Sequence, residues 1–174
     1  MSLLRQLRCS RHLKVFVLVA CCAAVTAGAQ SPLDMSGSYI ENSSGKHVSG
    51  NKTTILISQT DNQIEIRRQW NGTVQISTFP LDGSPGVYRT ASGVQGQGSA
   101  HWKGSTLSIE TLVAAPSQGG KTIRFHTKEQ WQLSKDKQTL KIHVETDSPD
   151  MPVEITNAAI VPYTDVYQRS PSTP

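Results

Sequence analysis

The sequence has few cysteines, and all of them stand near its beginning. Three occur among 174 residues, at Cys9, Cys21 and Cys22. The chain after Cys22 therefore has no thiolate that could form a disulfide, bind a metal or act as a nucleophile. A domain built from this part must be stabilised by its apolar core, and about 145 residues is long enough for one such core.

Charged residues are also scarce, at 17% of the chain, and their distribution argues against one class of partner. The first 29 residues hold four of the 17 basic residues and none of the 13 acidic ones. The other 13 basic residues match the acidic ones in number, so the basic excess belongs to the beginning of the chain. Nucleic-acid binding needs a basic patch or stripe, and the sequence therefore predicts no nucleic-acid partner.

The first 29 residues have the three parts of an export signal. Arg5, Arg8, Arg11 and Lys14 precede a mostly apolar run at 13–27, and Ala27-Gly28-Ala29 supplies small residues for cleavage before Gln30. The run is shorter than the roughly 20 residues of a comfortable transmembrane helix. Residues 1–29 are thus expected to be a cleaved signal peptide, and the alternative is a buried or anchoring helix.

The expected destination is a bacterial periplasm or the extracellular space, because an exported chain without disulfides suits these compartments. Leu18-Val19-Ala20-Cys21 also resembles a bacterial lipobox, in which the cysteine is lipidated and becomes the new N-terminus. A lipid anchor on Cys21 is therefore the alternative to a free exported protein.

Helical periodicity is missing after residue 30, whereas the alternation typical of strands recurs. Between Lys121 and Glu145 one alternating set holds Ile123, Phe125, Thr127, Glu129, Trp131 and Leu133, followed by Leu140, Ile142 and Val144. Because side chains alternate across a strand, this stretch predicts two strands joined by a turn at Asp136–Lys137. The predicted pairs are Leu133 with Leu140, Trp131 with Ile142, and Glu129 with Val144.

Two further hairpins follow from turn chemistry and apolar pattern together. Asp61-Asn62 suits a two-residue turn. That turn pairs Ile57 with Ile66. A similar turn at Gly104-Ser105 pairs Trp102 with Leu107 and Ala100 with Ile109.

Asn71-Gly72 is a strong hairpin signal, but a two-residue turn there conflicts with the apolar pattern. It would move Val74 and Ile76 off the face that carries Ile64 and Ile66. A three-residue loop or a bulge restores that face, and we predict one of these here because a one-residue slip inverts a strand.

The remaining segments complete the expected domain. Residues 30–35 are expected to be a short exposed lead-in, 36–163 a barrel and 164–174 a flexible tail ending in Ser-Pro-Ser-Thr-Pro. The last strand is expected within Pro152–Tyr163, and Gly93–Gly98 reads as a flexible turn. Short strands with regular turn signals predict an all-β, antiparallel, up-and-down meander barrel of about eight to ten strands.

Several motifs resemble those of bacterial exported lipocalin-like domain proteins. They are Leu133-Ser-Lys-Asp-Lys-Gln-Thr-Leu140, Trp102-x-Gly104-x-x-Leu107-x-Ile109, Leu81-Asp82-Gly83 and Ser36-Gly37-Ser38-Tyr39. The resemblance covers roughly residues 36–163, and it departs at Lys137 and Tyr39, where a glycine and a tryptophan are usual. It implies a lipocalin-like barrel, and lipocalins at large bind small hydrophobic molecules.

Glu129 is the main candidate for a functional residue, because its register places a carboxylate in the apolar row. Arg68 shares the inner row with Trp70. One interpretation is a polar anchor for a ligand headgroup, with tryptophan walls around it. The other is a structural ion pair. The candidate ligand-binding residues are Arg68, Trp70, Trp102, Phe125, Glu129 and Trp131.

Catalysis, a cofactor and a metal site are not expected. The pattern points His101, His126 and His143 outward, and the chain lacks nucleophile-elbow and nucleotide-loop motifs. The leading hypothesis is an exported, non-catalytic barrel that binds or carries a small lipophilic molecule. The alternative is a cell-envelope module with a self-filled barrel and a protein partner.

Overall fold

The computed structural model describes residues 33–42, 52–117, 119–151 and 161–171. All regular secondary structure in these residues is β, in ten strands: β1 (Gly37–Glu41), β2 (Thr54–Gln59), β3 (Gln63–Trp70), β4 (Thr73–Pro80), β5 (Gly86–Arg89), β6 (Gln95–Lys103), β7 (Thr106–Pro116), β8 (Thr122–Leu133), β9 (Thr139–Asp147) and β10 (Tyr163–Arg169). No helix among these residues has the length and apolar character of a membrane span.

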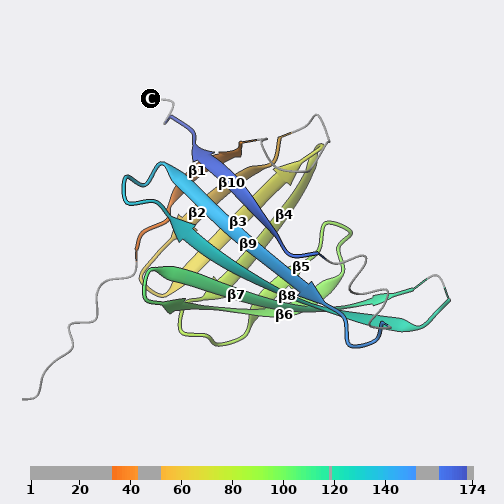
Figure 1. Cartoon of the computed structure of the whole chain (residues 1–174). Coiled ribbons are helices and arrows are strands. Elements are labelled where there is room, and N and C mark those ends of the chain that lie inside the picture. The colour runs from red at the N-terminus through yellow and green to blue at the C-terminus, as the bar shows by residue number, and fades with distance from the viewer. Residues whose placement is uncertain (1–32, 43–51, 118, 152–160, 172–174) are drawn as a thin grey trace, which may run out of the picture. The chain divides into compact units, whose positions relative to one another are not determined.

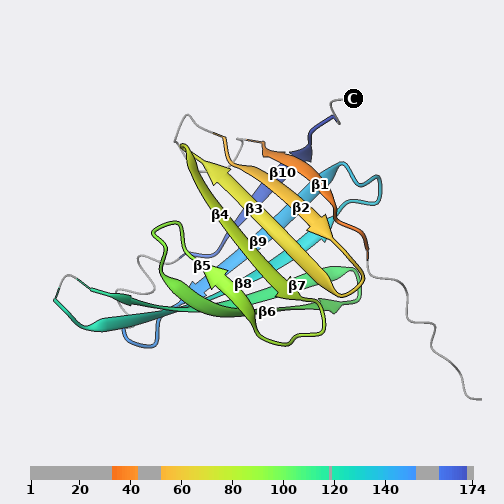
Figure 2. The ribbon, with the colours of Figure 1, turned by 180° about the vertical axis from the view of Figure 1, so that it is seen from behind.

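Each strand pairs antiparallel with its neighbours in sequence, and β10 pairs with β1, so the sheet closes into a barrel (Figures 1 and 2). This confirms the predicted all-β meander barrel. The expected signal peptide at 1–29, with Cys21, lies outside the described residues. Most of the strand expected within Pro152–Tyr163 lies outside them as well.

Three predicted hairpin registers are confirmed. Ile57 lies opposite Ile66, and Trp102 lies opposite Leu107. In the β8–β9 hairpin the pairs are Leu133 with Leu140, Trp131 with Ile142, and Glu129 with Val144. In all three hairpins turn chemistry and apolar alternation favour the same register.

The prediction for the β3–β4 turn was wrong. Asn71 and Gly72 have φ values of 47° and 76°, as a two-residue primed turn requires, and Arg68 lies opposite Gln75. Val74 and Ile76 consequently point outward and are 39% and 49% exposed. The turn fixes the register, and the inner face of β4 is polar where it faces Arg68.

The predicted boundary at the C-terminus was also wrong. Residues 163–169, placed mostly in a flexible tail, form β10, which pairs with both β9 and β1. Tyr163 lies opposite Val144, and Arg169 lies opposite Tyr39. The strand therefore closes the barrel. The tail was predicted from the turn-forming residues that follow Arg169, whereas residues 163–169 are held by pairing with a strand on each side.

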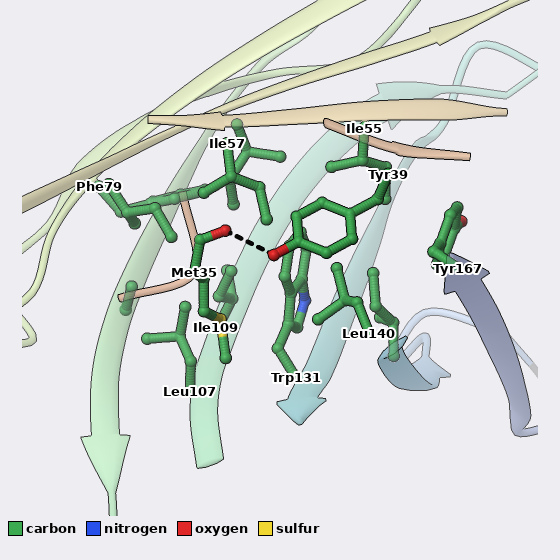
Figure 3. Packing of buried hydrophobic residues seen from close by; sticks show 14 of the residues in the cluster. Met35, Tyr39, Ile55, Ile57, Phe79, Leu107, Ile109, Trp131, Leu140 and Tyr167 are labelled. Carbon is green, nitrogen blue, oxygen red and sulfur yellow. Dashed lines mark hydrogen bonds between the residues drawn. The ribbon is translucent and has the colours of Figure 1, made fainter. Parts of the chain in front are cut away.

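Apolar side chains fill the barrel interior around Trp131 (Figure 3). Trp131, Leu107 and Leu140 are fully buried in this cluster. Met35 is fully buried there too, although the segment that carries it was expected to be exposed. Tyr39 donates a hydrogen bond from its hydroxyl to the carbonyl oxygen of Met35 at 3.0 Å. Met35 thus closes this end of the barrel, which we call the packed end.

The glycine-rich stretch Gly93–Gly98 was expected to be a flexible turn, but two of its glycines, Gly96 and Gly98, lie in β6. A methyl group at Gly98 would lie 2.6 Å from the Cε1 atom of Phe79. Glycine is needed here because the ring of Phe79 packs against the backbone of β6.

Candidate ligand-binding site

Three of the residues predicted for the site meet inside the barrel. Arg68 of β3 and Glu129 of β8 form an ion pair, with 19% and 14% of their side chains exposed. The indole Nε1 of Trp131 donates a hydrogen bond to Glu129 Oε2 at 2.8 Å, and the Arg68 guanidinium lies 5.3 Å from the Trp131 ring centre. The carboxylate in the apolar row therefore has two partners.

Electrostatics stabilise the charged state of Arg68. Burial acts to lower the pKa of Arg68, but the charge of Glu129 and its hydrogen bond outweigh burial, and the net shift is upward. The guanidinium is thus held as a cation against a carboxylate, in the middle of the barrel.

Two tyrosines of β10, Tyr163 and Tyr167, interact electrostatically with this pair. Burial raises the pKa of Tyr167, and the carboxylate of Asp165 adds to the effect. Burial also raises the pKa of Tyr163, with Asp165 and Glu129 contributing. These hydroxyls therefore stay protonated at neutral pH and can take part in hydrogen bonds as donors.

The Arg68–Glu129 pair separates the packed end from a half of the interior with greater exposure. There Trp70 and Phe125 point inward but are only partly buried, and Tyr163 is 43% exposed. Tyr88 also points inward and is partly buried, and it packs against the buried cluster. Their inward direction follows from the register, in which Tyr88 lies opposite Gly96 and Phe125 opposite Val113. We call these four residues the aromatic wall.

Trp102 lies apart from the other predicted site residues. It packs against the core near the β6–β7 turn, at the packed end. Its indole nitrogen is buried and has no hydrogen-bond partner among the described residues. Of the six predicted residues, Arg68, Glu129 and Trp131 are in contact, and Trp70 and Phe125 belong to the aromatic wall.

The enclosed space beside the ion pair is small. Arg68, Tyr88 and Glu129 line it with five other residues, and its volume is about 10 Å³. This is close to the space that one water molecule needs. An organic ligand does not fit in this space.

A second concavity lies on the outer side of the barrel, over β6, β7 and β8. Its volume is about 330 Å³, and its lining includes Pro85, Glu110, Leu112 and His126. His126 lies 3.8 Å from Glu110 and 3.6 Å from Asp147, and its side chain is 40% exposed, as its predicted outward direction requires. Within the described ranges no three His, Cys, Asp or Glu side chains converge as metal ligands would.

The sequence interpretation missed several residues of this region. Glu41, Tyr88, Asp165 and Tyr167 all point inward in the register, and Tyr88 lines the small space beside the ion pair. The signal in β10 was available, because Tyr163, Asp165, Tyr167 and Arg169 fall on alternate positions. Tyr88 sits in a strand of only four residues, too short for a periodicity argument.

The described strands define a closed ten-strand barrel of the lipocalin-like class. No protein-family profile matches the chain, and no curated protein matches it. Among solved structures, the REP1-NXSQ fatty acid transporter is similar with a TM-score of 0.52 and 14% identity, covering 79% of this chain and 97% of its own. Fatty-acid-binding protein 1 of Echinococcus granulosus is similar with a TM-score of 0.55 and 12% identity, covering 78% of this chain and 97% of its own. At these identities the likeness shows the shared fold alone.

Proposed function

We propose that this protein is a non-catalytic barrel that binds a small lipophilic molecule with one polar group. The alkyl or ring part lies against the aromatic wall, and the polar group lies at the Arg68–Glu129 pair. The observation that carries the proposal is the contrast within one barrel. Trp131 and Leu107 at the packed end are fully buried, whereas Trp70 and Phe125 point inward and remain partly exposed.

Partly exposed aromatic rings beside a few polar groups are typical of a binding site for a small molecule. A ring that faces the inside of a barrel but keeps contact with water forgoes part of its hydrophobic stabilisation, roughly 25 cal/mol for each Å² left uncovered. A bound ligand recovers that contribution. The two fatty-acid proteins that share the fold support the proposal by analogy only.

A second candidate function is a protein-interaction module, and the outer surface favours it. Leu56, Val74 and Ile76 point outward and are 48%, 39% and 49% exposed. In the register Leu56 and Ile76 both lie opposite Arg67, one on each side of β3. A pull-down from cell envelope with Ile76→Asp as control tests this, and specific capture without any lipophile binding would favour it over the first proposal.

We also propose that the protein is exported, on the strength of the pattern in residues 1–29. Mass spectrometry of exported material should find Gln30 as the N-terminus. An intact Met1 would contradict export by cleavage, and a lipid-modified Cys21 would support the anchored alternative.

The binding proposal is tested with the uncharged probe N-phenylnaphthylamine, whose fluorescence rises in an apolar site. We expect saturable enhancement with the barrel. Trp70→Leu should weaken it several-fold, because it removes part of the aromatic wall. The matched control is Trp102→Phe at the packed end, which should bind as the native protein does. No enhancement, or equal loss in both variants, would contradict the proposal.

A further inference from the structure

We infer that the outer face of β1 to β5 binds a second copy of this chain, through a two-fold interface centred on Glu65 and Arg67 of β3. The inference is independent of the proposed function, because the side chains that carry it point away from the barrel interior. It rests on exposed apolar side chains and on the order of the two charges among them.

Five large apolar side chains on this face are exposed to solvent. They are Ile40, Leu56, Val74, Ile76 and Val87. In the row across the sheet at Arg67, Leu56 lies on one side of the arginine and Ile76 on the other. The next row on one side ends at Ile40 and Val74, and the next row on the other side ends at Val87. The strands run side by side (Figure 2), so the three rows form one surface, which is typical of an interaction site.

Two opposite charges lie in the middle of this surface. Glu65 and Arg67 are alternate residues of β3, so both side chains point outward, about 7 Å apart along the strand. Both are exposed, and the ion pairs within the described residues involve neither of them. Each charge is therefore available to a partner.

The order of these charges matches a second copy of the same chain. Consider a two-fold axis in the plane between two such faces, perpendicular to β3 and passing between Glu65 and Arg67. It reverses the direction of β3 in the second copy, so Arg67 of each copy lies opposite Glu65 of the other. Two ion pairs then form from one pair of residues, which is the self-complementarity that a two-fold interface requires.

The same axis brings the apolar side chains of the two copies together. Because the axis is perpendicular to the strands, β2 faces β2 of the second copy and β4 faces β4. Leu56 therefore lies beside Leu56 of the second copy, and Ile76 lies beside its own counterpart. An axis parallel to β3 would place Arg67 against Arg67 and Glu65 against Glu65, which is unfavourable. The charges thus select one of the two arrangements.

Other occupants suit this face less well. A lipid surface or an apolar peptide would cover Glu65 and Arg67 without offering each a partner, and a charge that leaves water without a partner is costly. The three rows across five strands span roughly 400 Å². A stable interface of standard size buries about 800 Å² on each partner, so we expect a dimer that dissociates on dilution.

The test measures the mass of the protein by sedimentation velocity, from low micromolar to submillimolar concentrations. We expect a shift from monomer to dimer over this range. Arg67→Glu alone and Glu65→Arg alone should each weaken dimerisation about tenfold or more, because each sets like charges against one another. Lys141→Glu, an equal charge reversal at an exposed position of β9, is the matched control and should change nothing.

A mixture of the two reversed variants tests the geometry. One variant carries two carboxylates at the centre of its face and the other two cations, so they should form heterodimers although neither forms homodimers. Native mass spectrometry with one variant isotope-labelled identifies these. If a reversal prevents folding, Ile76→Asp provides a second route and should also give a monomer. A native protein that stays monomeric, a dimer that survives both reversals, or folded variants that fail to combine would overturn the inference.

Discussion

Glu129 is the residue whose environment distinguishes a packed barrel from a binding barrel. Its carboxylate holds Arg68 and the indole of Trp131 in place, in a position where the alternation of β8 calls for an apolar side chain. These contacts are structural, and in the proposed function the pair also meets the polar group of the ligand. These two roles are not exclusive, and stability measurements and binding measurements separate them.

The first prediction concerns stability. Glu129→Gln should lower the free energy of unfolding by about 3 kcal/mol, because it leaves Arg68 as a partly buried cation without a carboxylate. Urea unfolding followed by tryptophan fluorescence measures this. Glu65→Gln on the outer face should change it by less than about 0.5 kcal/mol. If Glu129→Gln were as mild as the control, the pair would not be structural. Arg68→Met combined with Glu129→Gln should recover part of the loss.

At the scale of elements, turn chemistry decided the register where two signals disagreed. Asn71-Gly72 imposed a two-residue turn, and β4 was inverted relative to the apolar pattern. The pattern failed because the interior next to Arg68 is polar, with Gln75 and Ser77 buried on the inner face. Where the interior is apolar, as for Trp131 and Ile142, the same reasoning gave the correct pairs.

The second prediction compares one substitution at two glycines. Gly72→Ala should cost about 1 kcal/mol, because φ is 76° but nothing lies within 4 Å of the added methyl group. Gly98→Ala should cost about 2 kcal/mol or more, because the methyl group would overlap the Phe79 ring. Urea midpoints of both variants measure this. The reverse order would contradict the packing of Phe79 against β6.

The third prediction concerns the segment before β1. Met35→Ala should destabilise the barrel by about 3 kcal/mol, because it empties a fully buried position at the packed end. Val87→Ala, at a position that is 55% exposed, is the matched control and should be nearly neutral. Equal effects would mean that Met35 does not close this end in solution.

At the scale of the whole molecule, the sequence predicted the barrel class, but it did not predict which two strands close the barrel. Hairpins carry local signals, since the turn and both strands lie close in sequence. The pairing of β1 with β10 joins segments far apart in the chain, and no local pattern reports it. For the same reason Arg68 and Trp70 could be placed on one face, whereas their relation to Asp165 and Tyr167 emerged only from the closed barrel.

The fourth prediction concerns acid stability. Asp150 accepts hydrogen bonds from the Arg124 side chain at 2.9 and 2.7 Å, which lower the pKa of Asp150 from 3.8 to about 2. Neighbouring serines lower the pKa values of Asp34, Asp82 and Asp136 in the same direction.

Since folding lowers these pKa values, their contribution is complete above about pH 5 and is lost as the pH falls toward about 2. The urea midpoint should decrease over that window, and Asp150→Asn should flatten part of the decrease. A midpoint independent of pH between those values would contradict these interactions.

The most direct test of the central claim is an isotope-filtered NOE experiment with decanol bound to the labelled protein. Decanol carries no charge, so the result reports on the apolar contacts alone. The account predicts contacts from the alkyl chain to Trp70, Phe125 and Tyr163, and none to Met35 at the packed end. Contacts confined to Leu56, Val74 and Ile76 on the outer surface, or no contacts at saturating decanol, would contradict it.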